Sequence, residues 1–301
     1  MFGFRPDGTK IKCGDAIEKI MPHIMTERSD AQNWCEVDMR CETLDEYIND
    51  AHARTGISIN YMTIVIASLV RVFSLRRRLN RFVMNGRIFQ RNALYFSITI
   101  KASLRDDAPD LSTKIRFDGT ETIFEVKEKV ESTLTNLLKK QTNNGTNKLA
   151  GVLTGMPNFL VKGAVGLVKF LDKHGMLPNS ILNLSPFHTS VWVTNLKSIK
   201  GNWIYHHCYN FGTLGLYVCM GKEKEEAVVE NGEVKSGKVI RFGVTMDERY
   251  CDGFYYIKSL KMWRDFMMNP RKLEVKPDVE PIESKKERKK RIKNKNKQKI
   301  S

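Results

Sequence analysis

The sequence has few of the features that mark membrane, secreted or zinc proteins. Its six cysteines are scattered over 301 residues without a Cys-x-x-Cys pair, so we predict reduced thiols and neither a disulfide framework nor a zinc site. The most apolar run, residues 61–73, is interrupted by Arg71, and the run 152–171 contains Pro157 and two lysines. Neither run is a transmembrane segment. The N-terminus has no apolar signal core, and we expect a cytoplasmic protein.

Two kinds of ligand site are also missing from the sequence. No glycine-rich loop follows a strand-like segment and opens a helix, which removes the support for nucleotide binding by that route. No three residues have metal-ligand spacing, so we expect no metal. The 41% of hydrophobic residues are nevertheless enough to bury a core, in one large domain or two ordinary ones.

Positive charge is concentrated at the C-terminus. The net charge is +16, and residues 284–301 contribute ten Lys or Arg against one Glu. Because blocks of like charge repel one another and stay unfolded, we expect a folded domain over residues 1–270 and a basic, disordered tail over 271–301. The tail is either a solvated extension or a weak, salt-sensitive contact to nucleic acid or an anionic membrane.

Hydrophobic periodicity predicts a mixture of helices and strands. The predicted helices cover residues 15–28, 43–53, 63–75, 121–140, two stretches separated by Pro157 and ending near 174, and 252–268. The predicted strands cover residues 34–41, 82–83, 87–90, 94–104, 111–117, 190–194, 214–220, 227–229 and 238–246. Thr43 and Glu46 form a capping-box pattern, and Asn85-Gly86 is a hairpin signal. This order indicates an α/β (α+β, two-layer) domain with a mixed central sheet covered by helices.

The most informative stretch is residues 242–253, FGVTMDERYCDG. A predicted strand runs there into a tight loop and then into a helix. Glu248 and Asp252 are four residues apart, with Arg249 between them. Gly253 is expected to let the chain pack closely where the helix begins.

Three segments together resemble the catalytic domain of the acyltransferase subunits of 2-oxoacid dehydrogenase complexes, which share the chloramphenicol acetyltransferase fold. The family's signature is Asp-His-Arg-x-x-Asp-Gly, and Glu248 occupies the histidine position. The matching positions are Asp247, Arg249, Asp252 and Gly253. Residues 190–196, SVWVTNL, resemble the family's strand ending in Ser-Asn-Leu, with Thr194 on the hydroxyl position. Residues 60–89 give a weaker match.

The resemblance implies a CoA-dependent acyltransferase that assembles as a homotrimer, with each active site in a channel between subunits. It makes Thr194 the oxyanion donor and Asp252 a structural carboxylate that pairs with an arginine. Asp247, Arg249 and Gly253 would support the loop. The implied substrates are an acyl-coenzyme A and a small acceptor, with no metal.

The sequence departs from the family at the position of the general base, where Glu248 replaces the signature histidine. An ordinary glutamate has a pKa about two units below that of histidine, which makes it roughly a hundredfold weaker as a base. Burial of Glu248 would offset this difference, whereas Arg249 folded back beside it would add to it. His206 or His207 is an alternative base, and His188 is a weaker candidate. Cys251 is interpreted as a packing residue.

Two functions remain open from the sequence. The first function is that of an acyltransferase, which transfers an acyl group from a CoA thioester to a small acceptor. We expect this enzyme to be free-standing, because the match starts near residue 15 and no lipoyl or subunit-binding domain is seen before it. The second is a catalytically inactive trimeric binding or scaffold protein of the same fold, in which Glu248 is an ion-paired loop residue.

Overall fold

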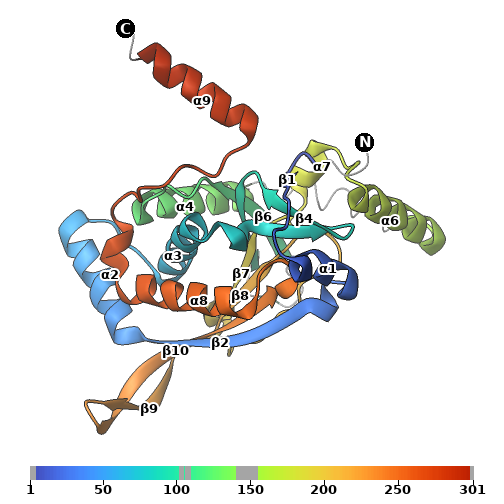
Figure 1. Ribbon diagram of the computed structural model, residues 1–301. Coiled ribbons are helices and arrows are strands. Elements are labelled where there is room, and N and C mark those ends of the chain that lie inside the picture. The colour runs from blue at the N-terminus through green and yellow to red at the C-terminus, as the bar shows by residue number, and fades with distance from the viewer. Residues whose placement is uncertain (1–4, 102–104, 106–109, 140–154, 299–301) are drawn as a thin grey trace.

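The computed structural model describes residues 5–101, 105, 110–139 and 155–298 (Figure 1). Within them, the centre of the molecule is a seven-stranded mixed sheet with the order β2-β10-β8-β7-β5-β6, and β9 pairs with β10 outside this path. The pairs β5/β7 and β7/β8 are parallel, and the others are antiparallel. In sheet order the strands are β2 (Gln32–Arg40), β10 (Glu233–Asp247), β8 (Leu216–Met220), β7 (Val191–Asn195), β5 (Leu94–Lys101) and β6 (Asp110–Phe117), with β9 (Lys224–Glu230) beside β10.

A second, three-stranded sheet is built around a tight hairpin. It contains β1 (Gly8–Lys10), β4 (Arg87–Arg91) and β3 (Arg81–Met84) in that order. Asn85 and Gly86 connect β3 to β4 and both have positive φ, 49° and 65°. This backbone twist matches that of a two-residue hairpin, and the predicted Asn-Gly turn is confirmed.

Helices cover one face of the main sheet. Figure 1 shows α2, α3, α4 and α8 on that face, whereas α6 and α9 extend from the body. The described helices are α1 (Ala16–Ile24), α2 (Cys41–Thr55), α3 (Tyr61–Leu75), α4 (Ile123–Lys139), α6 (Asn158–Lys173), α7 (Asn179–Leu184), α8 (Gly253–Met268) and α9 (Lys285–Gln298).

The central helix α3 explains why its sequence is apolar on nearly all sides. It packs against the sheet and contacts both α4 and α8, so that almost every side chain from Tyr61 to Ser74 is buried. Asn60 caps the helix by accepting hydrogen bonds from the backbone and hydroxyl of Thr63. The predicted helix over residues 63–75 is confirmed.

The opposite face of the sheet is covered by an irregular segment, residues 201–209, which we call the strap. The strap lies directly on two strand glycines. A Cβ added at Gly221 would come within 2.4 Å of the Trp203 nitrogen, and one at Gly243 within 2.2 Å of the Ile204 oxygen. Only glycine therefore permits this approach, which fixes the position of the histidines that follow in the strap.

The packed body extends beyond residue 270, where the sequence places the end of the domain. Leu273 and Ile282 are 1% and 3% exposed and belong to the main core. Residues 285–298 of the basic tail form α9, which projects from the body in Figure 1.

Two local predictions were wrong. Thr43 and Glu46 do not cap a helix, because α2 begins earlier, at Cys41, and Arg40 at its N-cap makes no side-chain capping bond. Gly253 does not serve close packing, because a Cβ added there meets nothing within 4 Å. Of the two helices predicted around Pro157, the second is α6, and the first includes residues outside those described. The loop predicted at 142–147 also lies outside them.

Candidate active site

A cavity of about 880 Å³ opens beside the end of β7. Its walls come from the start of α3, from β5, from α4 and from the strap. Much of the lining is apolar or aromatic, including Trp192, Tyr209 and Tyr217. Thr194 and His206 also line it, and Glu248 does not. The structure therefore brings together one residue predicted as oxyanion donor and one predicted as alternative base.

Thr194 lies near the end of β7 on the face of the sheet away from the helices. It is 9% exposed, and its Oγ1 has no oxygen or nitrogen partner among the described residues. Cys219, its register partner on β8, offers only a thiol, which is a weak hydrogen-bonding group. Because buried hydroxyls are usually hydrogen-bonded, this one is available to a ligand.

His206 reaches the cavity from the strap. Its ring stacks on Tyr217 with centroids 4.3 Å apart, and its Nε2 is buried with no hydrogen-bond partner in the described part of the chain. Burial and the neighbouring His207 lower the pKa of His206 below its ordinary value. The ring is therefore neutral near pH 7, and one nitrogen can accept a proton. His207 is exposed and packs its edge against Tyr209, outside the cavity lining.

The signature loop is held by a buried ion pair. Asp247, at the end of β10, accepts two hydrogen bonds from the Arg249 guanidinium, at 2.9 and 2.6 Å. Arg28 also donates to Asp247, at 3.3 Å, and its other nitrogens donate to the carbonyl oxygens of Tyr209 and Gly212. Arg28 therefore ties the loop to the end of the strap and to the residues just after it, a role that no sequence motif indicated.

Glu248 faces away from Arg249. The half-buried carboxylate accepts a hydrogen bond from Asn33 Nδ2 on β2, at 2.5 Å. Arg249 is engaged by Asp247, so the expected alternative in which Arg249 folds back beside Glu248 does not occur. Within one chain, Glu248 is separate from the Thr194 cavity.

The remaining loop residues have structural positions. Asp252 caps α8 by accepting from the Tyr255 backbone at 2.8 Å, and its carboxylate lies 3.8 Å from Arg78. Cys251 is buried, and burial raises the pKa of its thiol to about 12. A thiol that stays protonated at pH 7 is a poor nucleophile.

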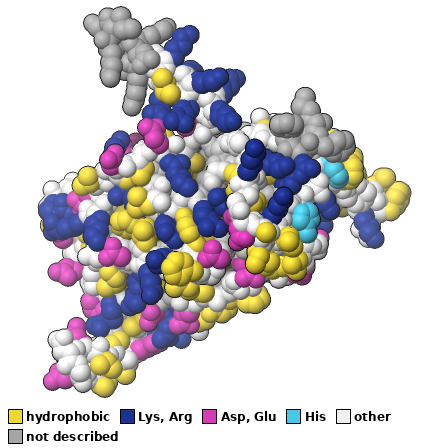
Figure 2. All heavy atoms as spheres, viewed as in Figure 1, with side chains coloured by type: hydrophobic (Ala, Val, Ile, Leu, Met, Phe, Trp, Pro, Cys, Tyr) yellow, Lys and Arg dark blue, Asp and Glu magenta, His cyan; other side chains and the backbone are white. Residues whose placement is uncertain are grey.

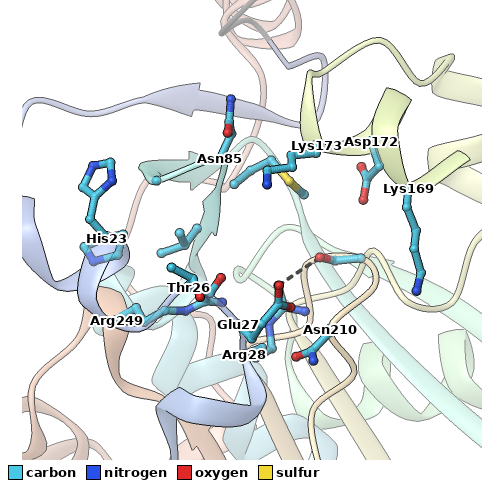
Figure 3. Close-up of a pocket in the computed structure, with 15 residues that line it drawn as sticks. His23, Thr26, Glu27, Arg28, Asn85, Lys169, Asp172, Lys173, Asn210 and Arg249 are labelled. Carbon is cyan, nitrogen blue, oxygen red and sulfur yellow. Dashed lines mark hydrogen bonds between the residues drawn. The ribbon is translucent and has the colours of Figure 1, made fainter. Parts of the chain in front are cut away.

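A smaller cavity of about 390 Å³ lies behind the loop, between α1, the β3–β4 hairpin and α6. Figure 3 shows Glu27, Arg28 and Asn210 on one side of it and Asp172 and Lys169 across from them. Sequence reasoning did not predict this site. Arg28 already pairs with Asp247, and Asp172 pairs with residues of the body described next.

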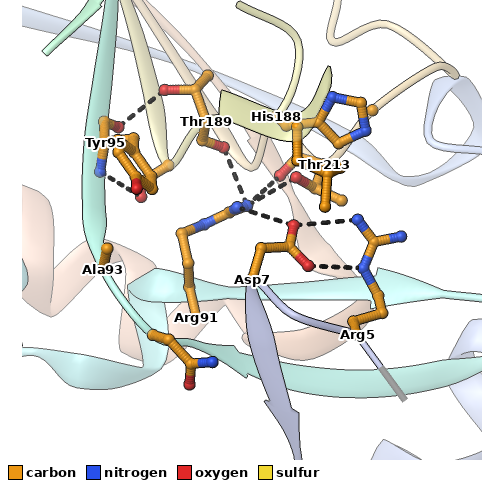
Figure 4. A network of polar contacts seen from close by, with 12 residues as sticks. Arg5, Asp7, Arg91, Ala93, Tyr95, His188, Thr189 and Thr213 are labelled. Atoms are coloured by element: carbon orange, nitrogen blue, oxygen red, sulfur yellow. Dashed lines mark hydrogen bonds and ion pairs between the residues drawn. The ribbon is translucent and has the colours of Figure 1, made fainter. Parts of the chain in front are cut away.

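Sequence reasoning also missed a buried polar network that joins the N-terminus to the strands of the site (Figure 4). Arg91 donates to the carbonyl oxygen of Thr189 at 3.1 Å and to that of Thr213 at 2.9 Å. These two threonines lie just before β7 and β8. Asp7 pairs with Arg5 at 2.8 Å and lies 3.8 Å from Arg91. Burial lowers the pKa of Arg91 to about 10, so the side chain stays charged at pH 7. The network aligns the two parallel strands that carry Thr194 and Tyr217.

His188 belongs to the same network. Its Nδ1 contacts Ser185 at 2.7 Å, and its Nε2 lies 3.1 Å from Asp172, which also accepts from Arg5 at 2.9 Å. His188 is 2% exposed and is not among the residues that line the Thr194 cavity. Its position is that of a structural residue.

Comparison with known proteins identifies this architecture. Residues 217–275 match the profile of the 2-oxoacid dehydrogenases acyltransferase catalytic domain, a stretch that contains the signature loop but not Thr194. The structure is similar to that of a probable dihydrolipoamide acetyltransferase from Listeria monocytogenes 4b F2365. This similarity has a TM-score of 0.52 at 13% identity and covers 90% of this chain and 98% of that one. The fold is chloramphenicol acetyltransferase-like.

Two further structures have this fold. Chloramphenicol acetyltransferase matches with a TM-score of 0.50 at 10% identity, covering 86% of this chain and 99% of that one. The dihydrolipoamide acetyltransferase of Azotobacter vinelandii gives 0.51 at 11%, covering 87% and 94%. That enzyme was studied for a serine, a histidine and an asparagine in its catalytic mechanism. A search of curated proteins gives no match.

The fold class and the family resemblance predicted from the sequence are confirmed. The described residues contain no helix that is both long and apolar enough to cross a membrane. In the same part of the chain, no three His, Cys, Asp or Glu side chains are grouped to hold a metal ion.

Proposed function

We propose that this chain transfers an acyl group from a CoA thioester to a small acceptor, in the cavity lined by Thr194 and His206. The observation that carries the proposal is that two buried polar atoms in the same cavity, Thr194 Oγ1 and His206 Nε2, have no hydrogen-bond partner among the described residues. An unpartnered buried polar group costs about 1–3 kcal/mol. A substrate that hydrogen-bonds to both atoms would remove that cost.

In the proposed reaction, neutral His206 takes the proton from the hydroxyl or thiol of the acceptor. The acceptor attacks the thioester carbonyl carbon, and the Thr194 hydroxyl donates to the oxyanion that forms. The intermediate collapses by breaking the carbon–sulfur bond, and protonated His206 returns the proton to the CoA sulfur. The cavity of about 880 Å³ and its apolar, aromatic lining suit the narrow pantetheine arm of coenzyme A.

Three variants test the assignment by measuring thiol release from acetyl-CoA with a panel of hydroxyl and thiol acceptors. Thr194→Val keeps the side-chain shape and removes the donor, with an expected loss of about 10²–10³-fold. His206→Gln removes the base, with an expected loss of about 10²–10⁴-fold. His207→Gln is the matched control, because His207 is the exposed neighbour outside the cavity, and it should keep nearly the full rate.

The lowered pKa of His206 sets the pH profile. Because the pKa of His206 lies below the ordinary value of about 6.5, the ring is still mostly neutral at pH 6.5. The value of kcat/KM should therefore start to fall only below that pH, where the ring takes up a proton. A profile that falls from higher pH, or a His206→Gln variant with full activity, would contradict His206 as base.

We also propose a homotrimer in which Glu248 of the partner subunit faces the cavity. The support is that Glu248 is half-buried and lies outside the cavity of its own chain, in a fold whose resemblance implies sites between subunits. Glu248→Gln decides whether this carboxylate is the base. With His206 as base, the rate of thiol release stays close to that of the wild type.

A second candidate function is binding of a CoA-like ligand without transfer. It is favoured by the replacement of the signature histidine by Glu248, whose carboxylate is held by Asn33. Calorimetric binding of CoA, combined with no thiol release by either the wild type or Glu248→His, would establish this function in place of catalysis.

A further inference from the structure

Helix α6 is a long helix that is little buried in the part of the chain that the structure describes. It spans Asn158–Lys173, and Asp172 is its single buried residue. In Figure 1 it extends away from the sheet, and in Figure 2 its outer end displays hydrophobic side chains next to basic ones. This exposure is unusual for a helix in which most side chains are apolar.

The residues of α6 divide into three stripes along the helix, because successive residues are rotated by about 100°. The stripe toward the body is half-buried and consists of Val161, Ala164, Val168 and Leu171. A second stripe consists of Lys162, Lys169 and Lys173. The third, which we call the apolar stripe, consists of Phe159, Leu160, Leu167 and Phe170, which are 73%, 47%, 58% and 52% exposed.

The apolar stripe is also flat. Gly163 and Gly166 lie on it or at its border, and a Cβ added at either meets nothing within 4 Å. Each glycine lowers the intrinsic stability of the helix. Contact between the apolar stripe and a partner would therefore stabilise α6. A flat apolar strip about 17 Å long beside a row of lysines has the pattern of a helix that lies in the plane of a membrane surface.

The helix is held at its C-terminal end by buried contacts to the body. Asp172 accepts from Arg5 at 2.9 Å and lies 3.1 Å from His188 Nε2, and both partners are buried. Because Asp172 is the only acidic residue of α6 and is engaged inward, the other charges of α6 are all positive. Lys162, Lys169 and Lys173 are exposed, and Lys169 and Lys173 also border the cavity of about 390 Å³.

We propose that α6 is a docking helix for an anionic lipid surface. The apolar stripe would enter the interface, and the lysine stripe would lie among the headgroups, as lysines with long apolar stems do. A second copy of this chain in antiparallel packing fits less well, because the two facing helices would then have their lysine rows on the same side. The ten Lys or Arg of residues 284–301 add a second attraction to the same kind of surface.

The test is co-sedimentation of the full chain with vesicles, one set of phosphatidylcholine alone and one with equal parts of phosphatidylglycerol. The wild type should bind the anionic vesicles at low salt and not the neutral ones. Leu167→Ser combined with Phe170→Ser should weaken that binding about tenfold or more. The replacement of Lys162, Lys169 and Lys173 by Gln should also weaken it and reduce its dependence on salt.

The matched control is Val229→Ser combined with Val234→Ser. These side chains are 74% and 72% exposed on the β9–β10 hairpin, so the change removes a similar apolar surface elsewhere. It should bind as the wild type does, and all variants should keep the wild-type circular dichroism because the altered residues are exposed.

Three results would overturn the proposal. The first is a wild type that binds neither vesicle, which would leave a protein partner as the occupant. The second is full binding by the Leu167→Ser, Phe170→Ser variant, which would assign lipid attraction to the basic tail alone. The third is a loss of oligomer mass in that variant by light scattering, which would make α6 an interface between copies.

Discussion

Asp247 and Arg249 form a two-bond ion pair within the signature loop, with Oδ1 2.9 Å from Nε and Oδ2 2.6 Å from Nη2. Both side chains are almost fully buried, at 1% and 4% exposure. The pair turns the intervening Glu248 toward Asn33 on β2, and the Asp247 carbonyl accepts from the Tyr256 hydroxyl at 2.6 Å. Asp247 therefore fixes the loop through its carboxylate and connects the loop to α8 through its backbone carbonyl.

Replacing Asp247 by Ala should destabilise the protein by about 3–5 kcal/mol, because Arg28 and Arg249 would be left buried without their counter-charge. Urea unfolding followed by fluorescence measures the change. Glu233→Gln is the control, since it removes one partner of an exposed pair with Lys235 and should change stability by less than about 1 kcal/mol. Equal effects of the two substitutions would contradict the role of Asp247.

Replacing Gly243 by Ala should displace the strap and, with it, His206. The added Cβ would lie 2.2 Å from the backbone oxygen of Ile204, and overpacking of this kind typically costs about 1–3 kcal/mol. Both the melting temperature and the rate of thiol release should fall. Gly253→Ala is the matched control, because nothing lies within 4 Å of its Cβ, and it should leave both nearly unchanged. A stable Gly243→Ala variant with full activity would show that the strap does not position the base.

The chain should form a trimer at micromolar concentration. The reason is that Glu248 and the Thr194 cavity lie apart in one chain, and the family resemblance implies a site shared between subunits. Light scattering should give three times the chain mass of 34.7 kDa. A monomer mass over the whole concentration range would refute both the trimer and any contribution of the partner's Glu248.

Stability should decrease as the pH falls below neutral, in two stages set by the network of Figure 4. Burial lowers the pKa of His188, so the unfolded chain binds more protons than the native one below about pH 6.5, and stability falls with pH from there. Burial alone would raise the pKa of Asp172, but His188 and Arg5 outweigh it and hold that pKa below its usual value. The stability that depends on Asp172 is therefore present above about pH 3.9 and is lost below it.

The measurement for this prediction is the melting temperature as a function of pH. His188→Gln should flatten the curve below about pH 6.5. It should also reduce the loss of stability below about pH 4, because Arg5 then holds the pKa of Asp172 down without His188. A His188→Gln curve parallel to that of the wild type throughout would show that His188 does not carry the first stage.

The sequence determined the elements of this protein, because their signals are local. The all-round apolar pattern of residues 63–75 predicted a buried helix, Asn85-Gly86 predicted a hairpin turn, and the Asp247–Gly253 signature predicted the fold. Each of these signals depends on one helical or extended segment and its caps or turns, which the order of residues specifies directly.

Only the tertiary structure decided which side chains share a site. Thr194 and His206 are separated by an irregular strap whose path depends on Gly221 and Gly243, two glycines on different strands. Sequence spacing could not show that Glu248 turns to Asn33 or that Arg91 and Asp172 belong to one buried network, because those partners come from distant segments. Their positions follow from which strands pair and which polar groups must be satisfied once water is excluded, and both are properties of the packed chain.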